Sequence, residues 1–236
     1  MSPAPRIIAI DGPAGAGKST AARTLAKRLG YVLLDTGALY RAVALAAERE
    51  GVDWSDDPGC AGVAKQLADR EALRLEPHPE GPPETKGTMV LLEGDDVSLA
   101  IRTPAIGMGA SKVSAFPGVR DALLDLQRQL GRAGVGVVAE GRDIGTVVFP
   151  DAPVKFFLTA SLEVRAKRRQ AELADKGKPM DLKAVEREVA QRDEQDSTRE
   201  VAPLKQAEDA VLIDSTGRDI EDVVSQMMRV IEDASS

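Results

Sequence analysis

The sequence contains very few of the residues on which most metal sites and nucleophilic triads depend. Among its 236 residues, Cys60 is the only cysteine and His78 the only histidine. A single cysteine excludes an internal disulfide and a metal cluster built on cysteines. His78 lies in a Pro/Gly-rich stretch, residues 76–87, and we interpret it as a loop residue. The composition therefore argues against histidine triads and histidine metal sites.

Asparagine is absent altogether. Its absence removes the Asn-Lys-x-Asp motif with which GTPases read guanine, and it removes any acceptor for N-glycosylation. A GTP-dependent switch is therefore a poor interpretation of this chain.

Long apolar runs and a net positive charge are missing too. No apolar run approaches the length of about 18 residues that a membrane span requires, and the first residues lack the apolar region of a signal peptide. The net charge of −7 disfavours general binding to nucleic acid or to a membrane surface. We expect a cytoplasmic protein with neither kind of partner.

One stretch carries clear chemistry: residues 12–19 fit the phosphate-binding pattern G-x-x-x-x-G-K-[ST]. The apolar residues 7–10 before it predict a buried strand. Residues 20–29 after it predict a helix that ends at Gly30, because glycine readily adopts the left-handed conformation at a helix end. A strand before the pattern and a helix after it are the context in which a P-loop occurs.

The residues of this loop are suited to binding phosphate. Its glycines let consecutive backbone N–H groups turn inward around a phosphate, and the helix N-terminus adds partial positive charge. Lys18 can reach the β- and γ-phosphates, and the Ser19 hydroxyl can ligate Mg²⁺. The sequence therefore predicts a site for a nucleoside triphosphate with Mg²⁺.

Strands and helices alternate along the rest of the chain. Apolar runs predict strands at 31–35, 73–76, 89–92, 135–139, 154–158 and 211–214. Helical periodicity predicts helices at 37–50, 58–73, from 104, at 119–131, from 161 to a break at 176–179, from 181, and at 220–231. This alternation predicts an α/β fold, with a parallel sheet that carries helices on both faces.

Polar clusters follow three of the predicted strands. The first strand ends in the P-loop, the second ends in Asp35 and Thr36 with Arg41 nearby, and another ends in 140–143. Ligands of such folds bind beyond the carboxyl ends of the strands, so these clusters predict one site. Two structural alternatives remain. Asp35 and Thr36 could cap a helix, and Arg142 and Asp143 could form a surface ion pair.

Three charged residues near the end of a predicted helix suggest a second phosphate site. Arg192, Asp196 and Arg199 fall at i, i+4 and i+7, so we expect them on one helical face. Arginine suits phosphate because its planar fork donates two hydrogen bonds. The alternative is a solvated face with ordinary ion pairs. A P-loop together with these arginines predicts two phosphate-bearing ligands.

A set of motifs in this order resembles the bacterial cytidylate kinases, the CMP/dCMP kinases, over nearly the whole chain. The motifs are residues 10–19, 34–41, 92–98, 101–103, 115–120, 140–152, 191–193 with Asp196 and Arg199, and 201–204. The resemblance implies a single P-loop kinase domain over 1–236, with an NMP-binding region at about 36–105 and a mobile lid at about 163–185. The loop 77–87 is longer and richer in proline than this family suggests.

The resemblance also implies which residues bind the donor. ATP would be contacted by the phosphate loop and by the residues that follow it. These are Gly12, Pro13, Ala14, Gly15, Ala16, Gly17, Lys18, Ser19 and Thr20. Mg²⁺ would be bound by Ser19, and Lys18, Arg142 and Arg192 would be catalytic.

The acceptor CMP or dCMP would be bound by several other side chains. Its phosphate would contact Arg41, Arg142 and Arg192, its sugar Thr36, Arg192 and Asp196, and its cytosine Ser111, Arg120, Asp143 and Arg199. The product would be CDP or dCDP, in pyrimidine nucleotide metabolism, and the protein would act as a monomer.

Two rival functions remain open at this point. Another P-loop kinase, for UMP and CMP, AMP or a small metabolite, would share the P-loop. A regulatory module could bind ATP without transferring its phosphoryl group, although the acceptor-side arginines would then have no purpose.

Overall fold

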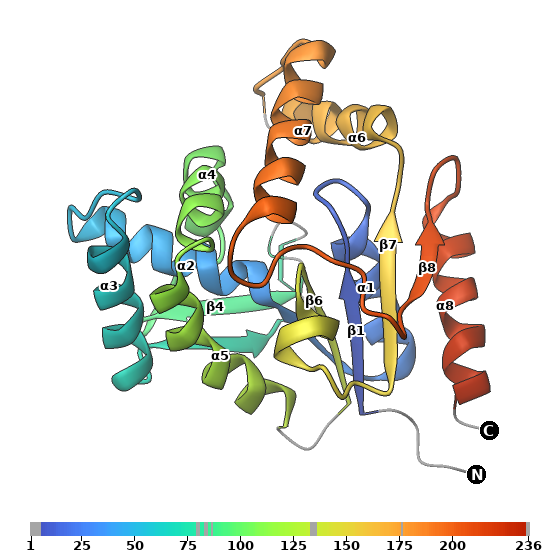
Figure 1. Cartoon of the computed structure of the whole chain (residues 1–236), viewed down its shortest axis with the longest axis horizontal. Coiled ribbons are helices and arrows are strands. Elements are labelled where there is room, and N and C mark those ends of the chain that lie inside the picture. The colour runs from blue at the N-terminus through green and yellow to red at the C-terminus, as the bar shows by residue number, and fades with distance from the viewer. Residues whose placement is uncertain are drawn as a thin grey trace. The chain divides into compact units, whose positions relative to one another are not determined.

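The computed structural model describes residues 6–78, 81–82, 85, 87–132, 136–175 and 177–234 (Figure 1). The chain forms two compact units. Unit 1 contains the chain up to Leu25 and from Gly141 onward, and unit 2 contains Ala26–Glu140. The boundaries therefore fall inside the first helix and at the end of a strand.

Unit 1 is built on three parallel strands. β1 pairs with β7, and β7 pairs with β8. Its elements are β1 (Ile7–Asp11), most of α1 (Lys18–Leu29), the π-helix η3 (Ile144–Val148), β7 (Val154–Thr159), α6 (Leu162–Asp175), α7 (Leu182–Thr198), β8 (Val211–Asp214) and α8 (Ile220–Ala234). The buried residues of β1, Ile8 to Asp11, continue directly into the P-loop.

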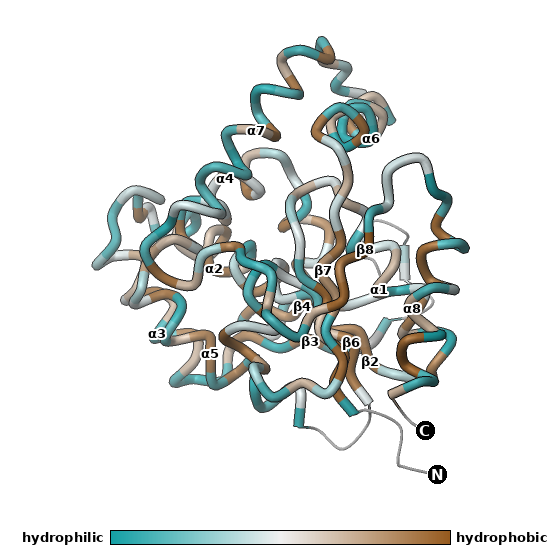
Figure 2. The backbone as a smooth tube through the Cα atoms, turned by 45° about the vertical axis from the view of Figure 1, so that its right-hand side comes forward, coloured by the Kyte–Doolittle hydropathy of each residue, from teal (hydrophilic) through white to brown (hydrophobic). Residues whose placement is uncertain are grey.

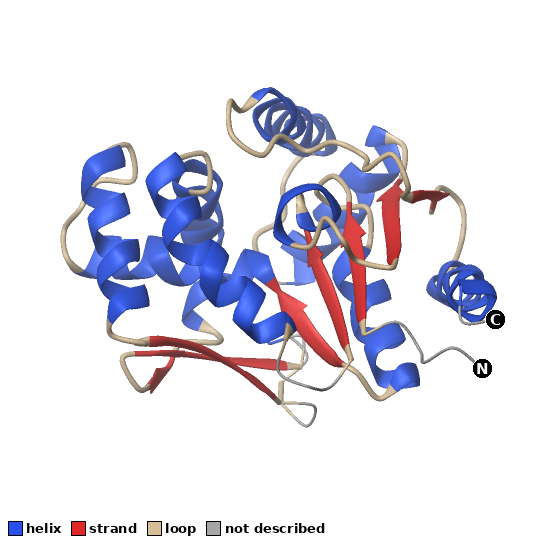
Figure 3. Ribbon diagram, turned by 60° about the horizontal axis from the view of Figure 1, so that its bottom comes forward, coloured by secondary structure: helices blue, strands red, loops and turns tan. Residues whose placement is uncertain are grey.

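Unit 2 contains a parallel strand pair, an antiparallel sheet and a group of helices (Figure 3). Its elements are β2 (Val32–Asp35), α2 (Thr36–Arg49), α3 (Asp57–Asp69), β3 (Leu73–Pro77), β4 (Thr88–Leu92), β5 (Asp95–Asp96), η2 (Ala100–Arg102), α4 (Pro104–Val113), α5 (Pro117–Gly131) and β6 (Val137–Gly141). β2 pairs in parallel with β6, so Asp35 lies beside Glu140 at their carboxyl ends.

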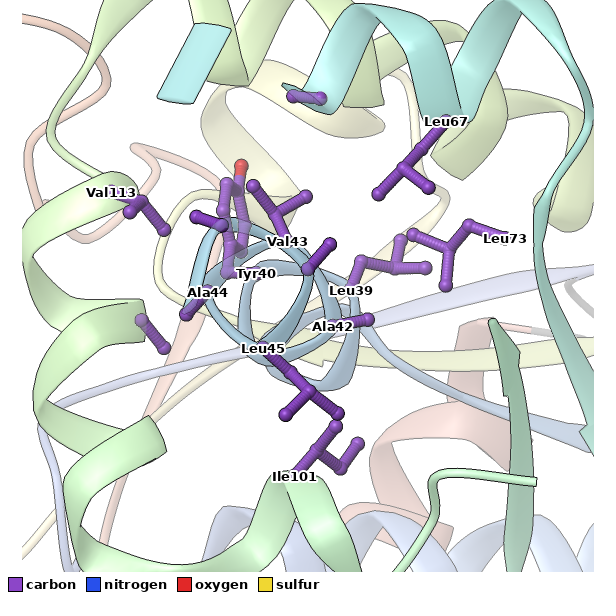
Figure 4. Close-up of a cluster of buried hydrophobic side chains, with 14 of the residues drawn as sticks. Leu39, Tyr40, Ala42, Val43, Ala44, Leu45, Leu67, Leu73, Ile101 and Val113 are labelled. Atoms are coloured by element: carbon purple, nitrogen blue, oxygen red, sulfur yellow. The ribbon is translucent and has the colours of Figure 1, made fainter. Parts of the chain in front are cut away.

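The core of unit 2 surrounds α2, which Figure 4 shows in end view with apolar side chains on several sides. Leu39 and Val43 are fully buried, and so is Ile101 from η2. Leu73 from β3 has only 1% of its surface exposed. α2 is rich in alanine, so α3 and α4 can both pack against it. Burial of this size stabilises each large side chain by about 1.5–3 kcal/mol.

The helices α6 and α7 of unit 1 share only a small apolar contact. Ala166, Leu173, Val185 and Val189 are buried there, with Met180 and Leu182 packed against them. Figure 2 shows α7 mostly in the teal of hydrophilic residues. The other buried residues of these two helices, Arg165 and Asp196, are charged. No helix of the described residues is long and apolar enough to cross a membrane.

The parallel strands and their helices confirm the expected α/β fold class, and most element positions are confirmed. The helix expected at 58–73 is too long, because α3 ends at Asp69. Arg70 caps it, and Glu71 then adopts a left-handed φ of 51° that turns the chain into β3. Val135, Lys176 and residues 79, 80, 83, 84 and 86 of the expected loop lie outside the described residues.

Candidate active site

The P-loop is shaped by glycines that no other residue could replace without movement. A Cβ at Gly12, where φ is +148°, would come within 1.9 Å of the carbonyl oxygen of Leu158 on β7. A Cβ at Gly15, where φ is +76°, would lie 3.0 Å from Cβ of Arg165 on α6. The loop therefore packs closely between β7 and α6, in the conformation that turns backbone N–H groups toward an anion.

The loop passes into α1 earlier than the sequence indicated. The helix expected from residue 20 already begins at Lys18, so that start is wrong by two residues. Gly17 is the last residue before the helix, and its carbonyl oxygen accepts from the N–H of Ala21 at 3.0 Å, which closes the first turn. Thr20 therefore lies inside that turn rather than at the start of the helix, and it is exposed. Contact of Gly17 and Thr20 with ATP stays a prediction.

Lys18 is the first residue of α1 and is buried, with 6% of its surface exposed. Its Nζ donates a hydrogen bond of 2.8 Å to the carbonyl oxygen of Pro13, across the base of the loop. The ammonium group is therefore held at the loop rather than extended into solvent. Contact of Lys18 with the β- and γ-phosphates stays a prediction.

Asp11, which immediately precedes the loop, is tied to the segment that follows β6. Its carboxylate accepts hydrogen bonds from the backbone N–H groups of Ile144, at 2.8 Å, and of Gly145, at 2.7 Å. Burial raises the pKa of Asp11 to about 6, although these two hydrogen bonds oppose the rise. Asp143 raises the pKa further and Lys18 lowers it. Asp11 therefore links the P-loop to Arg142 and Asp143, which lie just before the π-helix.

Unit 1 contains five of the expected acceptor residues, and four of them form two ion pairs. Nε of Arg142 donates a 2.7 Å hydrogen bond to Oδ2 of Asp196. Nη2 of Arg199 lies 3.6 Å from Oδ1 of Asp143. The suggested surface pair of Arg142 with Asp143 is therefore wrong: each has another partner, and Asp143 is only 4% exposed.

The carboxylate of Asp196 lies at the centre of this group. Burial by itself raises its pKa, but the charges of Arg142, Arg192 and Arg199, with the hydrogen bond from Arg142, hold the pKa below its ordinary value. Asp196 is therefore ionised, and it orients guanidinium groups that can also donate to a phosphate.

Arg199 was expected inside the helix and lies just after its last residue. α7 ends at Thr198, and Arg199 is its C-cap, with an extended ψ of 142°. Its Nε donates a 2.7 Å hydrogen bond to the carbonyl oxygen of Ala202. Its backbone N–H still donates to the carbonyl oxygen of Gln195. The charges of Arg192 and Arg199 both act on Asp196, as the spacing predicts.

In unit 2, Asp35 and Thr36 hold the start of α2. Asp35 is the N-cap and accepts from the N–H of Ala38 at 3.1 Å, so the capping interpretation is confirmed. The Thr36 hydroxyl donates to the carbonyl oxygen of Glu140 at 2.8 Å. Arg102, which the sequence did not single out, lies 3.0 Å from Asp35 in a buried ion pair.

The other three expected acceptor residues of unit 2 come from α2, α4 and α5. Nη1 of Arg41 donates to the carbonyl oxygen of Ile101 at 3.3 Å. Arg120 is buried, and its guanidinium lies 5.4 Å from the ring centre of Tyr40, the neighbour of Arg41. Ser111, on α4, uses its carbonyl to accept from the Ser114 hydroxyl. The expected acceptor side chains are thus divided between the two units.

The residues of the P-loop suit a magnesium ion that is carried by a nucleotide. Ser19 offers a hard oxygen ligand on the first turn of α1. Among the described residues, no group of three or more His, Cys, Asp or Glu side chains could hold a metal ion by itself. Such a donor set fits Mg²⁺, which commonly keeps several waters and takes most other ligands from substrate phosphates.

Several residues of this region were missed by the sequence reasoning. The motif gives Asp11 no role, although a carboxylate at the end of a buried strand, directly before the P-loop, is a signal of function. Arg165, Arg168 and Ser215 all donate to carbonyl oxygens of the P-loop. Their positions along the chain give no such indication, because only folding brings 165, 168 and 215 next to 14–16.

The fold and the loop define a P-loop nucleotide-binding protein of the α/β class. A gluconokinase from Sinorhizobium meliloti 1021 shares this fold, at 14% identity and a TM-score of 0.50, over 98% of this chain and 94% of that one. A family model described as cytidylate kinase matches residues 8–233.

Named relatives agree with the family model. A cytidylate kinase of Geobacter sp. (strain M21) is 52% identical over 96% of this chain and 93% of its own length. One of Pseudomonas aeruginosa (strain UCBPP-PA14) is 50% identical over 98% and 97%. One of Symbiobacterium thermophilum is 48% identical over 94% of each chain. The chain therefore belongs to the cytidylate kinase family, and the resemblance drawn from its motifs is confirmed.

Proposed function

We propose that the protein transfers the γ-phosphoryl group of ATP to CMP and dCMP, giving ADP with CDP or dCDP. Membership of the cytidylate kinase family supports this reaction. The observation in the structure that carries it is the arginine group around Asp196, which unit 1 contains together with the P-loop. A protein that only bound ATP would have no use for a second anion site of this kind.

The chemistry requires little from the protein beyond placement and charge. An oxygen of the acceptor phosphate attacks the γ-phosphorus in line, and the bond from that phosphorus to the β-γ bridging oxygen breaks. No general base is needed, because the acceptor phosphate is already an anion. The main barrier is the approach of two polyanions, which Lys18, Arg142 and Arg192 offset with positive charge fixed before the reaction.

The donor side is the P-loop with the first turn of α1. ATP lies along residues 12–20, where the backbone from Gly12 to Gly17 faces its phosphates and Thr20 lies beside Ser19 in the first turn of α1. The exposure of Thr20 leaves its side chain accessible to a nucleotide. The NMP-binding region is about 36–105, and the lid, about 163–185, includes most of α6.

The roles of the acceptor residues follow from the family resemblance. Arg41, Arg142 and Arg192 bind the acceptor phosphate, and Thr36, Arg192 and Asp196 lie near the sugar. The pairing of Arg142 with Asp196 supports this assignment, since it fixes the guanidinium plane before the phosphate arrives.

Asp143 and Arg199 read the cytosine, with Ser111 and Arg120. A carboxylate accepts a hydrogen bond from the exocyclic amine of cytosine, and arginine donates to its carbonyl oxygen or ring nitrogen. Uracil would present a carbonyl to the carboxylate instead. The buried pair of Asp143 and Arg199 supports this role, because both groups are held away from solvent.

Mg²⁺ accompanies ATP and is ligated by Ser19. When bound, it neutralises charge on the phosphate oxygens between which the group moves. We also expect a monomer, so light scattering on a sizing column would give about 25 kDa, the mass of one chain. A mass near twice that value would overturn this expectation.

One assay tests the proposed reaction: release of ADP from Mg-ATP with CMP, dCMP, UMP, AMP, shikimate or no acceptor. We expect CMP and dCMP to give the highest kcat/KM. Release of ADP without an acceptor would support the regulatory module, and a preference for AMP or shikimate would support another kinase.

The base-reading role has its own test, the substitution Asp143→Ala. We expect the preference for CMP over UMP, measured as the ratio of kcat/KM values, to fall about tenfold or more, because the loss of an unfavourable contact with uracil adds to the loss of a favourable one with cytosine. Asp151→Ala, in an exposed carboxylate nearby in sequence, is the control. An unchanged ratio would contradict the assignment.

A further inference from the structure

The carbonyl side of the P-loop is held by side chains from α6 and from the end of β8. Nη1 of Arg165 donates to the carbonyl oxygen of Ala14 at 3.1 Å, and Nη1 of Arg168 to that of Gly15 at 3.5 Å. The Ser215 hydroxyl donates to that of Ala16 at 3.0 Å. When N–H groups turn toward a phosphate, the carbonyl groups point away from it, so these contacts fix the loop from behind.

Arg165 holds more than the loop. Its side chain is only 8% exposed, and its Nε donates to the carbonyl oxygen of Ala160 at 2.9 Å. Its Nη1 also lies 2.6 Å from Oδ2 of Asp193 on α7. One planar guanidinium therefore joins the start of α6, the P-loop and α7, an arrangement that the single ammonium group of a lysine could not reproduce.

Asp193 lies between the acceptor residues of α7. Arg192 is its neighbour, and Asp196, one helical turn further on, accepts from Arg142. The contacts thus run from Ala14 through Arg165 and Asp193 into the helix that carries the acceptor-side charges. The substrate-binding roles proposed above leave Asp193 and Arg165 without a function.

We propose that Arg165 and Asp193 are positioning residues, which together fix the phosphate loop relative to the acceptor-binding residues of α7. This inference rests on the proposed phosphoryl transfer, because it concerns the distance between donor and acceptor phosphates. The pair touches neither substrate. Its loss displaces the two anion sites relative to each other and slows the transfer step more than it weakens either binding step.

The kinetic test compares Asp193→Asn with Glu194→Gln, which neutralises the adjacent, exposed carboxylate of the same helix. We expect Asp193→Asn to lower kcat between about tenfold and a hundredfold, as small misplacements of reacting groups do, while both KM values change less than about twofold. Glu194→Gln should match the wild type. Equal behaviour of the two variants, or a rise in KM with kcat unchanged, would overturn the inference.

A double variant separates positioning by the pair from two independent effects. Arg165→Lys keeps the charge but cannot keep all three contacts. We expect Arg165→Lys with Asp193→Asn to lose no more kcat than the worse single variant, because either change breaks the same connection. Losses that multiply would show that the two residues act separately, which would overturn the inference.

An NMR measurement tests the inference without any catalysis. The bond from Arg165 polarises the Ala14–Gly15 peptide, so the Gly15 amide signal should report it. We expect this signal to move in Asp193→Asn and to stay in place in Glu194→Gln; an unmoved signal in both would overturn the inference. A wild type that leaves CMP unphosphorylated would instead refute the proposed function, and the amide signal would still decide whether Asp193 acts on the loop.

Discussion

The helix α2 of unit 2 and the helices α6 and α7 of unit 1 bury different kinds of side chain. The buried residues of α2 in unit 2 are apolar except for Thr36, and they form the centre of a large apolar cluster. In unit 1, the buried residues of α6 and α7 include Arg165 and Asp196, each in an ion pair. Buried ion pairs are weak evidence for stability, whereas buried apolar surface is strong evidence. We therefore expect changes in α2 to act on folding, and changes in the ion pairs of α6 and α7 to act on chemistry.

The largest expected effect lies in unit 1 and concerns chemistry alone. Lys18→Ala should lower kcat on the order of a thousandfold, because it removes fixed positive charge at the transferred phosphoryl group. The melting temperature should change little. Steady-state release of ADP and thermal denaturation monitored by circular dichroism measure the two quantities.

Lys27→Ala is the matched control, since Lys27 is exposed on the same helix. Near-normal turnover of Lys18→Ala would remove this lysine from the mechanism.

The next effect lies in unit 2 and concerns folding. Leu39→Ala leaves a cavity in the cluster around α2 and should lower the free energy of unfolding by about 2–5 kcal/mol. In a chain of this size, each kcal/mol corresponds to about 2–4 °C in the melting temperature. Leu99→Ala, at a side chain that is 56% exposed, should have almost no effect. If the two variants melted together, the core assigned to unit 2 would be wrong.

A smaller effect concerns Arg41, a charged residue among the mostly apolar residues of α2. Arg41→Met keeps the length of the side chain but removes the guanidinium. We expect the KM for CMP to rise about 10- to 100-fold, with the KM for ATP within about twofold, because the proposed role of Arg41 is to bind the acceptor phosphate and not ATP.

Arg49→Met, exposed at the end of the same helix, controls for the loss of charge. Equal losses toward both substrates would misplace the acceptor site.

The smallest effect is a pH dependence of stability that arises in unit 1. The pKa of Asp11 is about 6 in the folded protein and 3.8 in its ordinary state. The folded state therefore binds the proton first as the pH falls, and the free energy of unfolding should rise by about 1 kcal/mol from pH 7 to pH 5. Urea denaturation at several pH values would show this rise in the wild type. Asp11→Asn should lack this component, and parallel curves for the two proteins would contradict it.

Local patterns predicted most of the fold. The limits of β8 and, to within one residue, those of β1 and β7 follow from apolar runs, and the N-cap Asp35 follows from its residue type. The end of α3 was predicted too late, because the apolar periodicity runs on into β3 and hides the turn at Glu71. Arg199 was expected inside α7 for a similar reason. The spacing of seven residues still brings the charges of Arg192 and Arg199 to Asp196, because Arg199 is the C-cap of α7 and keeps a helical φ of −59°.

The chemistry that is available to this protein can be read from its sequence alone. The sequence specifies a phosphate loop, because glycines, a lysine and a serine occur at fixed spacing between a strand and a helix. The order of its motifs specifies the family. Which charged side chains form ion pairs depends on the tertiary structure. Arg142 could have paired with Asp143, its neighbour in the chain, but the fold gives it Asp196 and brings Arg165 between Ala14 and Asp193. The reason is physical: a buried charge requires a partner, and the fold rather than the order of the chain determines which partners lie within reach.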